Sequence, residues 1–541
     1  MEIELKLALD PAAMPALLRH PALKALRRAR MRTARLANVY YDTPDSLLAA
    51  EGIALRVRRA GRRWVQTIKG PPEPGAGAGL QARAEYEWPL PGPALDLTRL
   101  SATPWRKLIA KTEKRGGLVR CFATDFERRT IPLRFPDGTL ALLCLDRGAI
   151  RATRDGRARN LPIAEIEIEL ESVESVESGA AANLFGLALA LAADLPLAVM
   201  TVSKAERGHA LRHGGRDLVS APARARSVPF AKDAATVDVL SQLVRECLHQ
   251  IAANAMGLLE DDDPEWVHQM RIGTRRLRSC LALVAPLAPS PALDFLVTEV
   301  KWLAGVLGTV RDWDVFTRET LPPLSAALAR DATTAGALKR LRARALSRDR
   351  AARAAARDAV ASRRFHRLLL AGGLHCATPR FGTVIAAVGA GQPDVLGNRA
   401  DAFASALLER RQRKLHARAA SLLEGSPEER HRVRIAAKRL RYVAEFFSPL
   451  FPRKRIKAYL KALTALQDVL GRLNDTATAL RVASETGGPA ADAAAGAVRG
   501  WVAAQAAAME PGLAGAWRQF AAAKPFWLRR QRRSACRSRT R

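Results

Sequence analysis

Two stretches within the first 170 residues alternate strictly between charged and aliphatic side chains. In MEIELKL, Glu2, Glu4 and Lys6 alternate with aliphatic residues, and AEIEIEL at 164–170 repeats the pattern with three glutamates. Alternate residues of a β-strand face opposite sides, so each stretch places its charges on one face and its aliphatics on the other. Such strands form either an ordinary sheet with one wet face or the wall of a polar interior, and the pattern leaves both open.

The same alternation recurs on other predicted strands, with cations as well as carboxylates. These positions are Arg56 and Arg58, Thr67 and Lys69, and Arg83, Glu85 and Glu87. Carboxylates on some strands and Arg or Lys on others are typical of a polyanion site, in which carboxylate oxygens hold a divalent cation and the cations hold phosphate. Frequent turn signals between the strands of residues 1–171 favour an all-β barrel or sandwich. Helices are expected at 11–26, 102–109 and 180–193, the last packed outside the barrel.

Nine ordered segments of residues 1–210 resemble the CYTH, or triphosphate tunnel metalloenzyme, family. They are MEIELKL (1–7), YYDTP (40–44), GIALRVR (52–58), QTIKG (66–70), RAEYE (83–87), TDFERR (124–129), LDRG (145–148), EIEIEL (165–170) and SKAERG (203–208). The resemblance implies a closed antiparallel barrel with a charged lumen that binds a triphosphate and a divalent metal. A charged lumen is physically tolerable only if water, counter-charges and a ligand fill it, because unpaired buried charges are costly.

The resemblance also implies roles for individual residues. The expected ligands of one or two Mg²⁺ or Mn²⁺ ions are Glu2, Glu4, Glu165, Glu167, Glu169 and Asp146. The expected triphosphate-binding residues are Lys6, Arg56, Arg58, Lys69, Arg83, Arg128, Lys204 and Arg207, and the catalytic set is Glu4, Lys6, Lys69 and Lys204. Three questions stay open: Asp146 and Arg207 could form a structural ion pair, Glu85 could orient Arg83, and residues 41–43 could be only a turn.

The function that these residues favour is hydrolysis of inorganic triphosphate to phosphate and pyrophosphate. A class IV adenylate cyclase uses similar charged residues, and thiamine or nucleoside triphosphates are alternative substrates. A protein of another class, which binds polyphosphate without catalysis, also fits. The carboxylates favour catalysis, because binding a long polyanion needs cations more than a metal site.

The net charge of +34 belongs mainly to the second part of the chain. Residues 1–210 hold 32 Lys and Arg against 24 Asp and Glu, whereas residues 211–541 hold 55 against 29. Such an excess favours a polyanionic partner such as polyphosphate, nucleic acid or an acidic membrane surface. Residues 211–232 carry Gly and Pro without periodicity and are expected to be a linker. From Asp233 onward the hydrophobic period is helical.

An internal repeat organises the helical part. VHQMRIGTRRLRS (267–279) aligns with RHRVRIAAKRLRY (430–442), and LGTVRD (307–312) aligns with LGRLND (470–475) at the same offset. On a helical wheel, each copy has a core stripe opposite a cationic stripe that begins with a histidine. The cationic stripes are His268, Arg271, Arg275 and Arg278, and His431, Arg434, Lys438 and Arg441. Such a stripe is also typical of an ordinary solvated helix face.

The paired stripes resemble the CHAD, or conserved histidine α-helical, domain, over residues 233–520. The resemblance implies two pseudo-symmetric helical bundles, at about 233–330 and 400–510, that bind inorganic polyphosphate through these eight residues. Arg and Lys at helical spacing can meet successive phosphates, and the aromatic content of 5% suits a ligand without bases. Nucleic acid is a less favoured partner. The chain is therefore expected to be multidomain, with an antiparallel barrel (α+β) followed by an all-α domain.

The remaining features concern the compartment and the end of the chain. The six cysteines lack metal-site spacing and are expected to be reduced and mostly buried, as in a cytoplasmic protein. The longest apolar run, at 179–202, is interrupted by polar residues and Pro196, so no membrane span is expected. The chain enters a strand at once, which leaves no room for a signal peptide. A basic helix is expected at 339–364, and residues 521–541 are expected to be a disordered basic tail.

Overall fold

The computed structural model describes residues 1–73, 77–171, 179–214, 221–231, 233–378, 397–486 and 491–528. The chain divides into two compact units. The first comprises Met1–Arg226, Ser241–Val310 and Arg353–Ala390, and the second comprises Ser227–Leu240, Arg311–Ala352 and Gly391–Arg541.

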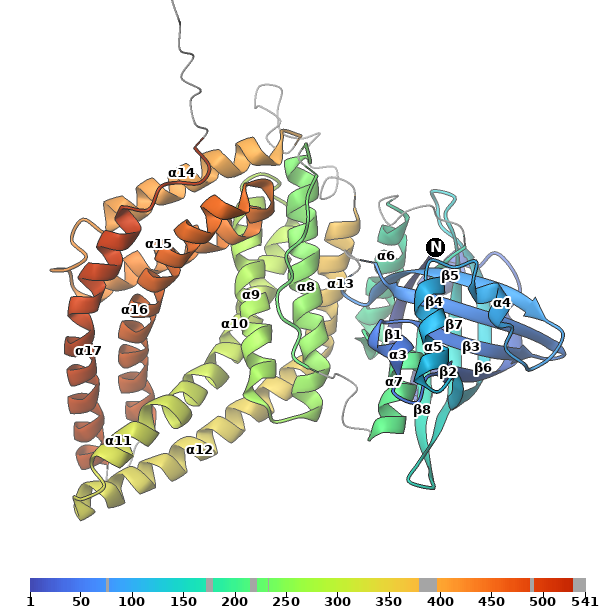
Figure 1. Cartoon of the computed structure of the whole chain (residues 1–541), viewed down its shortest axis with the longest axis horizontal. Helices are drawn as coiled ribbons and strands as arrows, with labels where there is room; N and C mark the ends of the chain where they lie inside the picture. The colour runs from blue at the N-terminus through green and yellow to red at the C-terminus, as the bar shows by residue number, and fades with distance from the viewer. Residues whose placement is uncertain are drawn as a thin grey trace, which may run out of the picture. The chain divides into compact units, whose positions relative to one another are not determined.

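A closed antiparallel barrel makes up most of the first 170 residues (Figure 1). Its strands are β1 (Glu2–Leu9), β2 (Arg32–Asp42), β3 (Ala54–Ala60), β4 (Arg63–Pro72), β5 (Leu80–Leu90), β6 (Val119–Arg134), β7 (Leu140–Arg154) and β8 (Arg157–Leu170). The strand order is β5-β4-β3-β2-β6-β7-β8-β1, and pairing of β1 with β5 closes the ring. A ninth strand, β9 (Leu197–Val199), adds to β1. The predicted barrel is confirmed.

Both faces of the first strand are buried, which explains its alternating sequence. Leu5 and Leu7 are fully buried on the aliphatic face, where helix α6 (Ala180–Asp194) contacts β1 and β8. Glu4 and Lys6 are also buried, on the face that points into the barrel. The predicted helix at 180–193 is thus confirmed as an outer layer, and the charges line the interior.

The helices inserted between strands differ in detail from the prediction. The expected single helix at 11–26 consists of η1 (Pro11–Ala13), α1 (Met14–Arg19) and α2 (Pro21–Leu26). His20 is extended between the last two, because a residue before proline is disfavoured in the helical region. The helix expected at 102–109 begins later, as α5 (Arg106–Thr112). Short helices α3 (Leu47–Ala50), α4 (Leu97–Leu100) and η2 (Glu113–Arg115) complete this set.

A well-capped helix follows β9 and contacts strands β6, β7 and β8. Helix α7 (Lys204–His213) begins with a capping box, in which Ser203 and Glu206 satisfy each other's backbone N–H groups. The expected linker at 211–232 therefore begins with three helical residues. Residues 215–220 and 232 of that linker lie outside the described residues.

The rest of the described chain is helical, as predicted. The helices are α8 (Thr236–Glu260), α9 (Pro264–Val284), α10 (Pro291–Asp314), the π-helix η4 (Val315–Thr320), α11 (Leu321–Ala327), α12 (Ala332–Ala361), α13 (Arg363–Ala377), α14 (Ala400–Arg418), α15 (Pro427–Phe447), η7 (Ser448–Leu450), α16 (Arg453–Glu485) and α17 (Ala491–Ala521). The basic helix expected at 339–364 is the later part of α12 and the start of α13. Of the expected tail, residues 529–541 lie outside the described residues.

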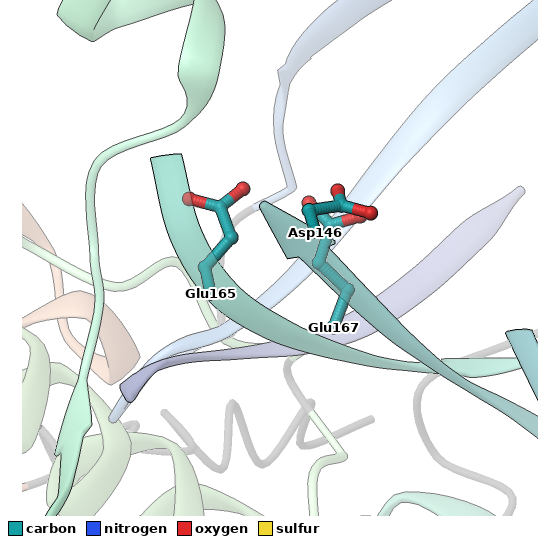
Figure 2. Close-up of side chains that lie close together, drawn as sticks. All are labelled: Asp146, Glu165 and Glu167. Atoms are coloured by element: carbon teal, nitrogen blue, oxygen red, sulfur yellow. The ribbon is translucent and has the colours of Figure 1, made fainter. Parts of the chain in front are cut away.

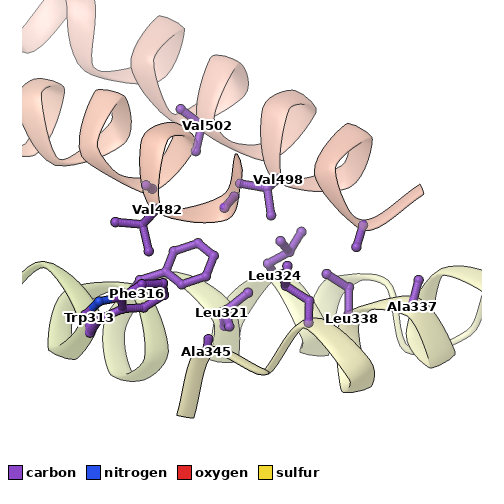
Figure 3. Packing of buried hydrophobic residues seen from close by; sticks show 14 residues of the cluster. Trp313, Phe316, Leu321, Leu324, Ala337, Leu338, Ala345, Val482, Val498 and Val502 are labelled. Atoms are coloured by element: carbon purple, nitrogen blue, oxygen red, sulfur yellow. The ribbon is translucent and has the colours of Figure 1, made fainter. Parts of the chain in front are cut away.

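The two repeated helices bury the faces that the helical wheel predicts. On α9, Met270, Leu277, Leu281 and Val284 are at most 1% exposed, and Val433, Leu440, Ala444 and Phe447 on α15 are fully buried. In the second unit, Trp313, Phe316 and Leu324 pack against Val482 and Val498 (Figure 3). This cluster joins η4, α11 and α12 to α16 and α17.

The cysteines and the apolar helices test two further expectations, namely that the cysteines are reduced and mostly buried and that no helix spans a membrane. Cys121, Cys144, Cys247, Cys280 and Cys376 are free and buried, and Cys536 lies outside the described residues. Among the described helices, none combines the length and apolarity that a membrane crossing requires.

Candidate active site

A cavity of about 140 Å³ lies inside the barrel and is lined chiefly by charged side chains. The predicted site residues that line it are Glu2, Glu4, Lys6, Arg56, Arg58, Lys69, Arg83, Arg128, Glu167, Glu169 and Lys204. The other lining residues are Tyr40, Ala54, Gln81, Glu85, Glu87, Phe126, Ser203 and Ala205. Eleven positions singled out in the sequence thus surround one cavity.

Strand register brings the carboxylates together. Antiparallel pairing of β1 with β8 sets Glu4 opposite Glu169 and Lys6 opposite Glu167. Directly opposed side chains on one sheet face have neighbouring Cβ atoms, so these groups interact across the strands. The two alternating stretches therefore form adjacent parts of the wall.

One part of the wall carries an excess of carboxylate. Glu2, Glu4 and Glu169 lie there with two lysines, of which Lys69 forms an ion pair with Glu2 and Lys6 forms one with Glu4 at 2.8 Å. Burial and the negative charges of Glu2 and Glu4 raise the pKa of Glu169 to about 7. Crowded oxygen donors with too few counter-charges are what a hard divalent cation would stabilise.

Another part of the wall carries an excess of positive charge. Burial, Arg56 and Arg128 lower the pKa of Arg58 to about 10, because the like charges repel one another. The buried Nε atoms of Arg56 and Arg83 have no hydrogen-bond partner among the described residues. Donors of this kind can be satisfied by the oxygens of an anion.

Three acidic residues form a tight cluster on β7 and β8. One carboxylate oxygen from each of Asp146, Glu165 and Glu167 lies within 4.8 Å of the other two. Figure 2 shows the three side chains close together. Of the three, only Glu167 lines the cavity. The spacing alone would suit a metal ion.

The cluster is already neutralised by cations. Lys204 Nζ lies 2.7 Å from Asp146 and 3.0 Å from Glu167, and it also contacts Glu165. Arg128 binds Asp146 at 2.7 Å, and Arg207 pairs with Glu165. Burial opposes ionisation of Asp146, but Lys204 and Arg128 outweigh it and hold the pKa of Asp146 below its usual value.

This network differs from the sequence expectation for three residues. Asp146, Glu165 and Arg207 do not line the cavity but lie in the ion network beside it. The suggested pair of Asp146 with Arg207 is wrong, because each has other partners. Sequence spacing shows the face of a strand but not the depth along it, so Asp146 and Glu165 could not be separated from the lining set, whereas Arg207 lies on helix α7.

The partners of Glu85 and Asp42 answer the two remaining questions that the sequence left open. Glu85 approaches Lys69 at 3.2 Å and Arg56 at 3.7 Å, so the suggested pairing with Arg83 is wrong. Residues 41 and 42 are the end of β2 and not a turn, and the Asp42 carboxylate accepts hydrogen bonds from the backbone N–H groups of residues 43, 48 and 49, which caps α3.

The sequence analysis missed Tyr40 as a lining residue. Burial opposes ionisation of its hydroxyl, but Arg56 lowers the pKa of Tyr40 through its charge and a hydrogen bond. The phenol ring stacks on Phe122 with centroids 4.5 Å apart. Its position two residues after Asn38, which binds Arg58 at 3.0 Å, gives the period-two signal that could have identified it.

The predicted cationic stripes lie on α9 and α15. His268, Arg271 and Arg275 are half-buried and Arg278 is exposed. On α15, His431 is exposed, and its Nδ1 donates a hydrogen bond of 3.0 Å to Oδ1 of Asn474. Arg441 is bound to Glu445 at 2.6 Å and to Gln467 at 3.2 Å, which offsets part of its charge.

Comparisons with known proteins agree with this architecture. A curated inorganic triphosphatase from Haemophilus influenzae is 30% identical over 212 residues, which are 39% of this chain and 54% of that protein. The chain therefore spans about half the length of that relative. The crystal structure of a CHAD domain from the plant Ricinus communis is 35% identical and covers 56% of this chain and 98% of its own, with a TM-score of 0.48.

A second solved structure is similar to part of the chain. It is a putative adenylyl cyclase from Hippeastrum described as having a dominant triphosphatase activity. It is 20% identical and covers 39% of this chain and 97% of its own, with a TM-score of 0.27. The family models that match are the CYTH domain over residues 1–208 and the CHAD domain over residues 242–484. This chain therefore carries a CYTH domain followed by a CHAD domain, in the order that the sequence predicted.

Proposed function

We propose that this protein is a metal-dependent inorganic triphosphatase that hydrolyses triphosphate to phosphate and pyrophosphate. One observation carries the proposal: negative charge is in excess on one part of the cavity wall, and positive charge is in excess on another part. The crowded carboxylates raise the pKa of Glu169 to about 7, and the crowded guanidinium groups lower the pKa of Arg58 to about 10. A bound divalent cation would offset the repulsion among the carboxylates, and the phosphate chain bound with it would offset the repulsion among the guanidinium groups. The triphosphatase relative supports this choice of substrate.

The residues that would hold the metal are Glu2, Glu4 and Glu169, with Glu167 beside them. Their oxygens suit Mg²⁺ or Mn²⁺, which prefer hard donors and retain waters in a cavity of this size. The bound cation would neutralise phosphate oxygens and lower the pKa of a water. Asp146 and Glu165 are better suited to hold Lys204 and Arg207 in place, because they bind these cations and do not line the cavity.

The residues that would hold the phosphates are the cavity's cations. Arg56 and Arg83 each present a buried Nε without a partner among the described residues, and Arg58 and Arg128 add charge beside them. Lys6 and Lys204 both contact Glu167, at 2.5 and 3.0 Å, next to the proposed metal ligands. Fixed cations there would stabilise the charge that develops on the leaving pyrophosphate.

A parallel assay tests the reaction and its substrate. The purified chain is given triphosphate, ATP or thiamine triphosphate, each with Mg²⁺ or with Mn²⁺, and the products are separated. We expect triphosphate to be the best substrate and chelation to abolish the activity. Cyclic AMP as the main product of ATP would instead establish a cyclase.

A matched pair of variants tests the metal assignment. Glu4→Gln removes one proposed ligand charge, and we expect a loss of roughly 100-fold or more in kcat, since one well-placed charge is worth several kcal/mol in a site of this kind. Glu127→Gln changes an exposed glutamate of β6 and should retain full activity. Undiminished hydrolysis by Glu4→Gln would overturn the assignment.

We further propose that the CHAD domain binds inorganic polyphosphate through the cationic stripes of α9 and α15. Their opposite faces are buried core, so the stripes face away from it, and α9 and α15 each follow an N-cap side chain that fixes their start. Retention of polyphosphate by the whole chain should weaken steeply with salt. Changing Arg271 and Arg434 together to Gln should weaken it further, whereas tighter retention of duplex DNA would favour nucleic acid as the partner.

A further inference from the structure

Strand β9 links the barrel to a helix of the CHAD domain inside the first compact unit. The Nδ1 atom of His366, on α13, accepts a hydrogen bond of 3.2 Å from the backbone N–H of Val199. Burial lowers the pKa of His366 to about 4, so the ring is neutral near pH 7 and Nδ1 can accept. Helix α13 also contacts α6, the helix that covers β1 (Figure 1).

From Val199 the contacts lead to the backbone of Lys6. Val199 pairs with Leu7, and the N–H of Met200 donates to the carbonyl oxygen of Lys6 at 3.0 Å. At the same edge of β1, the N–H of Lys6 donates to the carbonyl oxygen of Gly79 at 3.2 Å. A Cβ at Gly79 would lie 2.5 Å from Val199 Cγ1, so the segments that hold Lys6 meet at Val199.

The chain after β9 leads to the second lysine of the site. Ser203, four residues after Val199, caps α7, and Lys204 is the first residue of that helix. The Nζ atoms of Lys204 and Lys6 both contact Oε1 of Glu167. The position of β9 therefore determines the positions of Lys6 and Lys204, which both contact the Glu167 carboxylate.

Helix α13 is itself held closely by its neighbours. A Cβ at Gly373 would overlap the Phe185 ring of α6, and one at Gly372 would lie 2.7 Å from Leu248 of α8. Arg364 binds Glu299 of α10 at 2.6 Å. Because α13 cannot shift without displacing these contacts, it holds His366 in a fixed position.

We propose that His366 is a positioning residue for the triphosphatase site. Its hydrogen bond fixes β9, and β9 fixes Lys6 across the sheet and Lys204 along the chain. The first part of the CHAD domain then helps to position the active-site lysines, in addition to its proposed role in binding polyphosphate. This inference rests on the proposed triphosphatase function.

Three substitutions at one position separate the hydrogen bond from the bulk of the ring. His366→Leu removes the acceptor, and we expect kcat for triphosphate to fall about tenfold, in keeping with one lost hydrogen bond. His366→Asn places an amide oxygen near the position of Nδ1 and should restore kcat to within about twofold of the native chain. His366→Gln places its amide near Nε2 and should stay low. Arg367→Ala, an exposed neighbour on α13, is the control.

Hydrogen exchange gives a second measurement that does not depend on activity. In the full-length His366→Leu chain, amides of residues 5–9 and 198–201 should exchange faster, and His366→Asn should return them to native rates. Equal exchange and equal kcat in His366→Leu and the native chain would overturn the inference, and so would a His366→Gln chain as active as His366→Asn. If the native chain did not hydrolyse triphosphate, the proposed function would fail, and the exchange result would still decide the role of His366.

Discussion

At the scale of residues, the site consists of charged side chains whose burial is unfavourable for each one alone but is offset by nearby opposite charges. Burial disfavours a charged Lys6, but Glu167 and Glu4 outweigh it and raise the pKa of Lys6 well above its usual value. Removing one partner from such a pair leaves the other charge buried and uncompensated, which costs more than the pair contributes. The lumen residues therefore depend on one another, and single substitutions in it should have large effects.

Tyr40 offers a test with little structural disturbance. Tyr40→Phe removes the hydroxyl that binds Arg56 and keeps the ring stacked on Phe122. We expect kcat/KM for triphosphate to fall by roughly five- to tenfold, equivalent to about 1–1.4 kcal/mol, because the guanidinium loses one orienting partner. Tyr41→Phe, which lies in an apolar cluster, should keep native kinetics. Equal kinetics in both variants would show that the Tyr40 hydroxyl has no role.

At the scale of elements, helix α7 connects the site to the fold. It carries Lys204 and Arg207 on one face and lies against the barrel so closely that a Cβ at Gly208 would overlap the Phe122 ring. Phe122 in turn stacks on Tyr40. Close approach of α7 thus requires a residue without a side chain at this position.

Two alanine substitutions of helical glycines test this packing. Gly208→Ala should destabilise the chain by about 1–3 kcal/mol, since the methyl group must displace Phe122. Gly186→Ala, inside α6, meets nothing within 4 Å and should be neutral or stabilising by about 0.5–1 kcal/mol. Thermal unfolding of both variants beside the native chain measures the difference. A Gly208→Ala chain as stable as Gly186→Ala would mean that α7 packs less closely than described.

At the scale of the whole molecule, four partly or fully buried histidines should make the first unit sensitive to acid. Burial lowers the pKa of His209, His249, His366 and His375 to about 4. An unfolded histidine binds a proton below about pH 6.5, so protons favour the unfolded state. The stability is fully present above about pH 6.5 and falls as the pH drops toward 4, by at most about 1.4 kcal/mol per pH unit for each histidine.

Unfolding curves at pH 7 and pH 5 measure this loss. The native chain should show a clearly lower unfolding temperature at pH 5. His375→Asn removes one titrating group and should reduce the pH dependence, even if its stability at pH 7 is lower. An unchanged pH dependence in this variant would contradict the contribution of His375.

The sequence by itself determined an all-β first part, the helical repeat and the polarity of each element's faces. Period-two alternation in MEIELKL and AEIEIEL fixes which side chains share a strand face, and helical periodicity on α9 and α15 fixes which residues are buried, because backbone geometry alone sets both periods. Eleven of the predicted site residues could be named on this basis together with the family resemblance.

The tertiary structure decided how far along each strand a charge meets the cavity and which partner it has. Asp146 and Glu165 share the strand alternation of the lining residues, yet the barrel register places them in an ion network with Lys204 and Arg207 of α7. The link from His366 to β9 joins residues 167 positions apart, and local periodicity carries no information about such contacts. Pairing energies between distant charges exist only after the chain has closed, so only the folded structure could assign them.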